Sequence, residues 1–74
     1  MENENNEILA KLGQTIKQVR INKKLTLLEL EVRTGISEGG ISKIENGKKN
    51  LAVTTLIKLA KGLEIPLSEL LLDF

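Results

Sequence analysis

The chain has 74 residues, of which 41% are hydrophobic and 28% charged, and a chain this short builds one small domain around one hydrophobic core. Its net charge is +1 and it contains no cysteine and no histidine, which excludes a disulfide framework, a thiol nucleophile, a zinc finger and a Ser-His-Asp triad, so we expect no enzyme, no metal and no cofactor. No apolar run approaches the roughly 20 residues of a membrane span, and the acidic start is unlike an export signal, so we expect a cytoplasmic protein.

Polar residues open the chain, and a helix is predicted to follow them. We expect residues 1–6, which are rich in Asn and Glu, to form a flexible tail, and residues 7–74 to form the domain. From Glu7 to about Lys23, apolar residues recur at the spacing of a helix with one buried face. These residues are Ile8, Leu12, Ile16 and Val19.

Two short helices are predicted next, each with its own N-cap. Thr26 and Glu29 match a capping box, in which each side chain accepts a hydrogen bond from the other residue's free backbone amide. Ser37 is the N-cap candidate of the following helix, which should run from residue 38 to about residue 46. Gly47 can end this helix because glycine adopts a left-handed conformation without strain.

Two further helices complete the predicted fold. The first runs from about Val53 to Lys61, where Gly62 is expected to loosen its end, and the second begins after Pro66, which has no backbone donor to leave unpaired at a helix start. Because β-type alternation is nowhere sustained, the sequence predicts an all-α fold of five helices.

The segment from residue 27 to residue 46 has the spacing of a helix-turn-helix. A helix of about eight residues is followed by a turn that contains Gly35 and by a second, capped helix. Gly35 occupies the turn position at which a positive φ is needed. The apolar residues expected to hold the two helices at a fixed angle are Leu30, Ile36, Ile41 and Ile44.

These motifs resemble the phage-repressor-like DNA-binding domains, the Cro/CI-type or XRE-type helix-turn-helix family, over about residues 8–72. The matching positions are Leu12-Gly13, Ile16, Arg20, Leu30, Gly35-Ile36-Ser37, the run Ile41 to Lys48, Leu56, Leu59-Ala60, Leu63, Ile65 and Leu67 to Leu70. The resemblance implies a compact five-helix, repressor-like bundle with a central helix-turn-helix. It also implies a sequence-specific transcriptional regulator that binds duplex DNA as a homodimer, with one recognition helix in the major groove of each operator half-site.

The resemblance further implies which residues meet the DNA. The residues expected to face the bases are Glu38, Gly39, Ser42 and Lys43, and Lys43 is the best candidate for a contact with guanine. The residues expected to face the phosphates are Thr26, Leu27, Ser37, Gly40, Asn46, Lys48 and Lys49. The charge distribution agrees, because the segment from Lys11 to Lys49 holds nine basic and four acidic residues whereas the two ends are acidic.

Two pairs of residues have structural or assembly roles in this interpretation. Arg20 and Glu45 match a buried ion pair that ties the first helix to the end of the third, and we prefer a purely structural role for it. Leu72 and Phe74 are candidates for a dimer face, although they could instead complete the core of one chain.

Four features depart from the family pattern. Leu27 stands where glutamine is common and cannot form a side-chain hydrogen bond with phosphate. Glu31 stands where alanine is usual, so its stem is expected to bend out to solvent. Glu38 is unfavourable beside phosphates unless it accepts from a cytosine amino group. Gly39 and Gly40 remove side chains that could read bases, although they would let the backbone approach the DNA closely.

These departures support an alternative from another functional class. The chain could be a protein-interaction or antitoxin-like module that retains the fold with weakened DNA readout, and its protein partner would then be unknown. A carboxylate site for a hard cation also stays open, although no EF-hand-like spacing of acidic residues is present.

Overall fold

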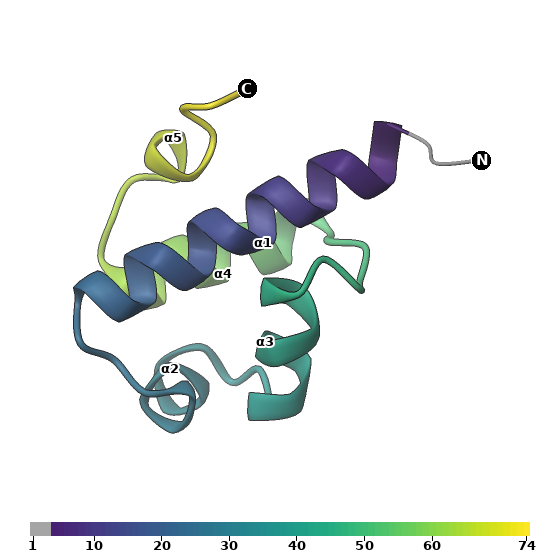
Figure 1. Ribbon diagram of the computed structural model, residues 1–74. Helices are drawn as coiled ribbons and strands as arrows, with labels where there is room; N and C mark the ends of the chain where they lie inside the picture. Colours follow the sequence, from purple (N-terminus) through teal and green to yellow (C-terminus); the bar gives the residue numbers. More distant parts are fainter. Residues whose placement is uncertain (1–3) are drawn as a thin grey trace.

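Five α-helices make up most of residues 4–74, the part of the chain that the computed structural model describes (Figure 1). They are α1 (Glu4–Asn22), α2 (Leu27–Thr34), α3 (Glu38–Glu45), α4 (Val53–Leu63) and α5 (Leu67–Leu70). The described residues contain no β-strand, so the predicted all-α, five-helix class is confirmed. Within the same residues, no helix has both the length and the hydrophobicity needed to cross a bilayer.

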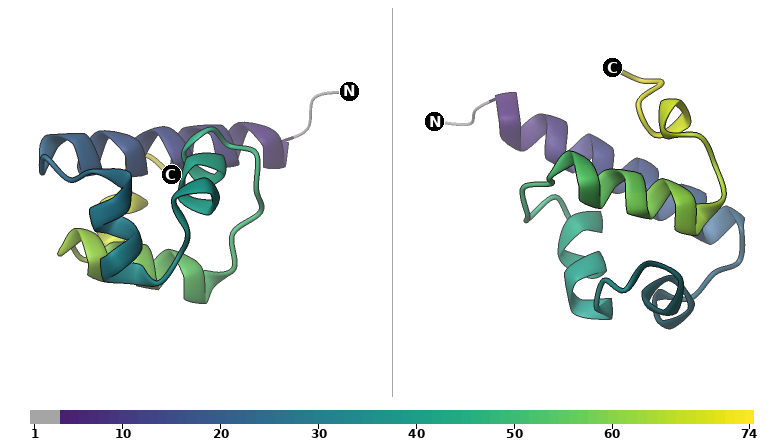
Figure 2. Two further views of the ribbon diagram at one scale, coloured as in Figure 1. Left: turned by 90° about the horizontal axis from the view of Figure 1, so that it is seen from below. Right: turned by 180° about the vertical axis from the view of Figure 1, so that it is seen from behind.

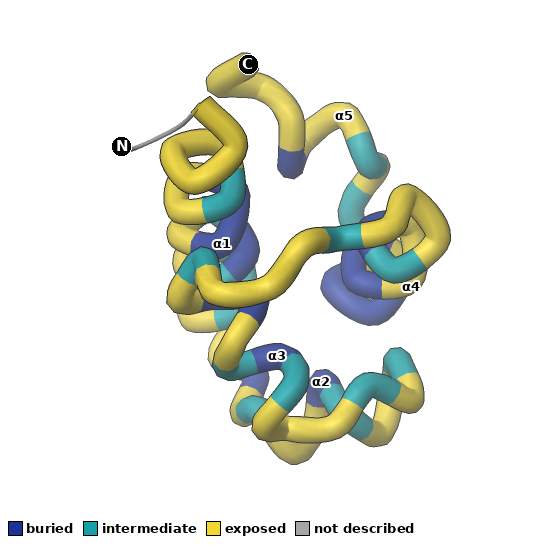
Figure 3. The backbone as a smooth tube through the Cα atoms, turned by 90° about the vertical axis from the view of Figure 1, so that its right-hand side faces the viewer, coloured by how far each residue is buried: buried dark blue, intermediate teal, exposed yellow. Residues whose placement is uncertain are grey.

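The helices are arranged around the contact between α1 and α4. Helix α5 packs on these two helices at one end of the molecule, and the α2–α3 pair packs on them at the other (Figures 1 and 2). Each helix turns its buried face toward this centre and its exposed face outward (Figure 3). The core residues are Leu12, Ile16, Leu25, Leu30, Ile41, Ile44, Leu56, Leu59, Ala60, Leu63 and Leu70. Helix α2 contributes Leu30 to this core and α3 contributes Ile41 and Ile44, and apart from the buried Glu45 the other residues of these two helices are exposed or half-buried.

Helix α1 begins earlier than the sequence predicts. It starts at Glu4 rather than Glu7, so residues 4–6 are helical and not part of a flexible tail, while residues 1–3 of that predicted tail lie outside the described residues. The acidic side chains of Glu4 and Glu7 lie in the first turn, where negative charge is favourable against the helix dipole.

Helix α4 ends later than predicted, and the expected effect of Gly62 is wrong. The helix continues through Gly62 to Leu63, and Glu64 then takes a left-handed conformation with φ of 59°. Gly62 is buried, and a Cβ atom on it would lie 2.6 Å from Cγ2 of Thr34. The glycine therefore allows α2 to pack closely on α4.

Candidate nucleic-acid interface

The N-terminus of α2 is held by the predicted capping box. The Glu29 backbone N–H donates to Oγ1 of Thr26 over 3.0 Å, and the Thr26 backbone N–H donates to Oε1 of Glu29 over 2.8 Å. Both hydrogen bonds with Thr26 lower the pKa of Glu29, and the one from the Thr26 backbone has the larger effect. Leu27, the next residue, is half-buried against the core. Only its backbone is therefore available for the phosphate contact that the sequence predicts at this position.

The turn between α2 and α3 has the predicted geometry. Gly35 has φ of 77°, and its N–H donates to the carbonyl oxygen of Glu31 over 2.7 Å. The Ile36 N–H donates to Oγ1 of Thr34 over 3.1 Å. The turn is therefore held by hydrogen bonds from its own amides to the last residues of α2. The Ile36 side chain packs against the core.

The first turn of α3 is capped by side chains from two places in the chain. The Gly40 N–H donates to Oγ of Ser37 over 3.0 Å, as an N-cap serine predicts. The Glu38 N–H donates to Oε1 of Glu31 over 2.9 Å. The expectation that Glu31 bends out to solvent is therefore wrong. The Glu38 amide has no acceptor within α3, and the carboxylate of Glu31 accepts from it instead.

Helix α3 has one buried and one open face. Ile41, Ile44 and Glu45 are buried, and the residues between them point away from the core because the helix repeats every 3.6 residues. Of the predicted base-facing residues, Glu38, Gly39 and Lys43 are exposed and Ser42 is half-buried. A Cβ atom at Gly39 would have no neighbour within 4 Å, so the outer surface of α3 is unobstructed there.

The basic residues that follow α3 are held close to its end. Gly47 has φ of 71°, and a Cβ atom on it would lie 2.8 Å from Cα of Ala10 in α1, so this loop rests directly on α1. The Lys48 N–H donates to the carbonyl oxygen of Lys43 over 2.9 Å. Asn46, Lys48 and Lys49 are exposed in this loop, directly after the C-terminal end of α3.

Arg20 and Glu45 form an ion pair behind this face. The Arg20 guanidinium donates to both carboxylate oxygens of Glu45, over 2.7 Å from Nε and 3.1 Å from Nη2, and Nη1 donates to the Leu25 carbonyl oxygen over 2.9 Å. The two side chains are 12% and 5% exposed. The hydrogen bond to Glu45 raises the pKa of Arg20, against the opposing effect of its burial. The pair joins α1, the chain before α2 and the end of α3.

Two close contacts between helices were not predicted from the sequence. A Cβ atom on Gly13 of α1 would overlap the carbonyl oxygen of Ile44 and lie 2.7 Å from that of Glu45. The Arg33 side chain of α2 donates from Nη1 to the carbonyl oxygen of Gly62 over 3.0 Å. A glycine within a helical pattern was the only local signal for the first contact, and no local signal marks the second.

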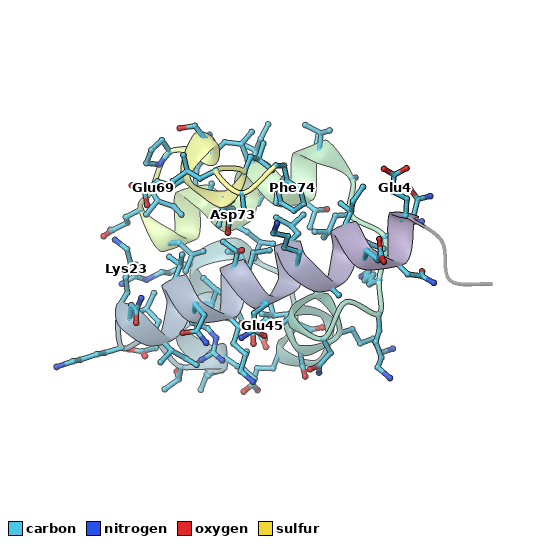
Figure 4. The ribbon with its side chains drawn as sticks, turned by 45° about the horizontal axis from the view of Figure 1, so that its top comes forward. Glu4, Lys23, Glu45, Glu69, Asp73 and Phe74 are labelled. Carbon is cyan, nitrogen blue, oxygen red and sulfur yellow. The ribbon has the colours of Figure 1, made fainter. Side chains whose placement is uncertain are left out.

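The C-terminal residues lie on α1, away from α2 and α3. Nζ of Lys11 donates to the Asp73 carbonyl oxygen over 3.1 Å and lies 5.5 Å from the centre of the Phe74 ring. Figure 4 shows Asp73 and Phe74 on one side of α1 and Glu45 on the other. Leu72 and Phe74 are 77% and 53% exposed, so they do not complete the core, which Leu70 closes instead.

Other kinds of site are not evident in the described residues. No group of three or more acidic side chains among residues 4–74 is placed to hold a metal ion. The same residues enclose no pocket for a small molecule, and they leave no buried side-chain nitrogen or oxygen atom without a hydrogen-bond partner.

Sequence comparison identifies related proteins. The family model HTH_3, described as helix-turn-helix, matches residues 16–70. The HTH-type transcriptional repressor RghR of Bacillus subtilis (strain 168) is 42% identical over 55 residues, which are 73% of this chain and 41% of RghR. The chain spans less than half the length of the first two curated relatives that it matches.

Solved structures with the same fold include two restriction-modification controller proteins. C.AhdI from Aeromonas hydrophila matches with a TM-score of 0.84 and 30% identity, over 86% of this chain and 97% of C.AhdI. C.Esp1396I bound to a 25 base pair operator site matches with a TM-score of 0.79 and 31% identity, over 88% of this chain and 91% of that one. These two structures match the chain over nearly their full length.

Proposed function

Because the chain belongs to the HTH_3 family of helix-turn-helix proteins, and proteins similar to it are named as a transcriptional repressor and a restriction-modification controller protein, we propose that it binds duplex operator DNA and regulates transcription. The observation that carries the proposal is the open face of α3, with Ser42 and Lys43 beside the exposed lysines Lys48 and Lys49. A short helix that is packed on one side and unobstructed on the other fits the major groove. Such a protein works where the DNA is, which we take to be the cytoplasm.

The binding mechanism divides between two sets of residues. Lys48, Lys49 and the polar groups of Thr26 and Asn46 supply phosphate contacts, which set affinity and make it depend on salt. Lys43 and Ser42 supply sequence preference through base edges, with guanine N7 and O6 as the acceptors for Lys43. Glu38 can accept from the amino group of cytosine.

We also propose that the protein acts as a homodimer. A single module with few base contacts binds weakly, whereas two α3 helices related by a two-fold axis meet half-sites about 34 Å apart. Leu72 and Phe74 support this proposal because they are apolar, exposed and only two positions apart in the chain. Helix α5 lies at the far end of the molecule from α2 and α3 (Figure 1), so an interface there would leave both α3 helices open.

A protein-interaction module is the second candidate function. Leu28 and Val32 of α2 are 55% and 78% exposed, and they lie four residues apart on one helix face. An exposed apolar stripe of this kind favours a protein partner. The function would then resemble that of an antitoxin, which binds DNA and a protein together.

Selection from a random pool of duplex DNA tests the main proposal. We expect a preferred, two-fold related sequence, with a shuffled duplex of the same composition as the control. If a dimer makes about six phosphate contacts, its affinity should fall by about three orders of magnitude between 50 and 200 mM salt. A pool without enrichment, or a binding constant that does not change with salt, would overturn the proposal.

A further inference from the structure

The hydrogen bond between α2 and α3 places a carboxylate at the leading end of the proposed recognition helix. Glu31 is half-buried, and its Oε1 accepts from the Glu38 N–H over 2.9 Å although the two residues lie seven positions apart on different helices. A side chain that reaches across the turn in this way limits how α3 can rotate against α2.

The same carboxylate changes the charge at this end of α3. The N-terminus of a helix carries a partial positive charge and unpaired amides, and it therefore attracts phosphate. Here two of the first three amides of α3 are occupied, that of Glu38 by Glu31 and that of Gly40 by Ser37. The Glu38 side chain adds a second negative charge in the same turn, so a phosphate would meet two carboxylates where it normally meets free donors.

We propose that Glu31 is a positioning residue for DNA recognition, whose carboxylate holds the start of α3 against α2 and repels phosphates from it. This inference rests on the proposed function. Repulsion of phosphate weakens binding to every duplex by the same factor, so it lowers affinity and leaves the ratio between preferred and unrelated sequences unchanged. Holding the start of α3 instead sets how Ser42 and Lys43 meet the base edges, so loss of the hydrogen bond should lower that ratio.

Two substitutions separate the charge from the hydrogen bond. Glu31→Gln removes the charge and keeps an oxygen that accepts from the Glu38 N–H, whereas Glu31→Ala removes both. Glu69→Gln is the control with the same change in net charge, because Glu69 is exposed on α5, and α5 makes no contact with α3. Each variant is titrated with the duplex that the wild type selects from a random pool and with a shuffled duplex of the same composition.

We expect Glu31→Gln to bind the shuffled duplex about two- to five-fold more tightly than the wild type does, the range given by one charge near a helix end. It should bind the preferred duplex more tightly by the same factor, so its ratio of preferred to shuffled affinity should equal that of the wild type. Glu31→Ala should lower this ratio because the hydrogen bond is lost, and Glu69→Gln should leave both affinities close to those of the wild type. Equal effects of Glu31→Gln and Glu69→Gln would overturn the proposal, since they would show only a change in net charge.

Amide hydrogen exchange tests the positioning role without DNA. The Glu38 amide should exchange more slowly in the wild type and in Glu31→Gln than in Glu31→Ala, while exchange at Ile44 stays the same. Equal exchange at Glu38 in all three proteins would overturn the positioning role. If the wild type binds no duplex, both the proposed function and the repulsion of phosphate are overturned. The exchange rate of the Glu38 amide would still decide whether Glu31 positions the start of α3.

Discussion

Nε of Arg20 lies 2.7 Å from Oε2 of Glu45, and this ion pair joins α1 to the last turn of α3 where only 12% and 5% of the two side chains are exposed. The pair has a geometric consequence for the proposed interface. Since Lys43 lies two residues before Glu45, about 200° around the helix, holding Glu45 on α1 turns the exposed Lys43 outward. A buried pair of this kind holds one arrangement of the helices, because either charge left alone would be strongly destabilising.

Removing one member of this pair should destabilise the fold. We expect Glu45→Ala to lower the free energy of unfolding by about 3–5 kcal/mol, because the Arg20 guanidinium would keep its charge without a partner. Urea unfolding followed by circular dichroism measures the change. The double variant Arg20→Met, Glu45→Leu serves as the control and should lose less than Glu45→Ala does. A loss below about 1 kcal/mol in Glu45→Ala would place the pair among exposed, weak ion pairs.

The lysines near the end of α3 should control DNA affinity and not stability. We expect Lys43→Ala, Lys48→Ala and Lys49→Ala together to abolish binding at moderate salt, because all three are exposed and bind no other described side chain. Each lost phosphate contact should reduce the slope of log K against log salt by about one. A mobility-shift series measures the binding, and a thermal melt within a few degrees of the wild type shows that the fold is intact.

The matched control for the lysine variant lies on α4. Lys58 and Lys61 are exposed on that helix, so Lys58→Ala with Lys61→Ala removes positive charge elsewhere on the molecule. Its affinity should stay close to that of the wild type. If this control loses as much affinity as Lys48→Ala with Lys49→Ala does, the DNA-binding face is wrongly assigned.

Polar substitutions at the C-terminus should shift the protein toward the monomer. We expect Leu72→Ser with Phe74→Ser to raise the dimer dissociation constant, because both side chains are largely exposed in one chain and can be buried only against another molecule. Sedimentation equilibrium measures the constant. Val53→Ser is the control, since Val53 is 68% exposed on α4. A wild type that sediments as a monomer at all concentrations would contradict the dimer proposal.

Two glycines should respond in opposite ways to the same substitution. Gly13→Ala should cost about 1–3 kcal/mol or more, because the new Cβ would overlap the Ile44 carbonyl oxygen. Gly39→Ala should stabilise the protein by up to about 1 kcal/mol, since nothing lies within 4 Å of that position. Thermal unfolding of both variants measures the difference. Similar melting temperatures for the two variants would show that α1 and α3 can move apart without loss.

The capping box of α2 should make stability depend on pH below neutrality. The pKa of Glu29 is lowered by its hydrogen bonds with Thr26 from a reference value of 4.5, so the folded state favours the carboxylate. The Glu29 carboxylate therefore contributes fully to the free energy of unfolding above about pH 4.5, the pKa of Glu29 in the unfolded chain. This contribution is lost as the pH falls through the lower pKa of the folded state. Glu29→Gln should be less stable than the wild type at pH 7, and the difference should shrink near pH 3. A difference that is the same at both pH values would contradict this assignment.

The elements of this fold were predictable where their signals are local. The capping box of Thr26 and Glu29, the N-cap Ser37 and the left-handed Gly35 each depend on residues within four positions along the chain, and the structure has all three. The bounds of α2 and α3 therefore agreed with the sequence. The bounds of α1 and α4 did not, because the polar residues before Glu7 are helical and α4 continues through Gly62, where the glycine lies against α2.

The sequence by itself determined that this protein is an all-α chain of five helices with a helix-turn-helix at its centre, since helix periodicity and caps are properties of short segments. Only the tertiary structure decided that Glu31 caps α3, that Gly13 lies against the Ile44 carbonyl oxygen, and that Leu72 and Phe74 stay outside the core. These contacts join residues on different helices, so they depend on the angles and distances at which the helices pack, and no pattern along the chain encodes those quantities directly.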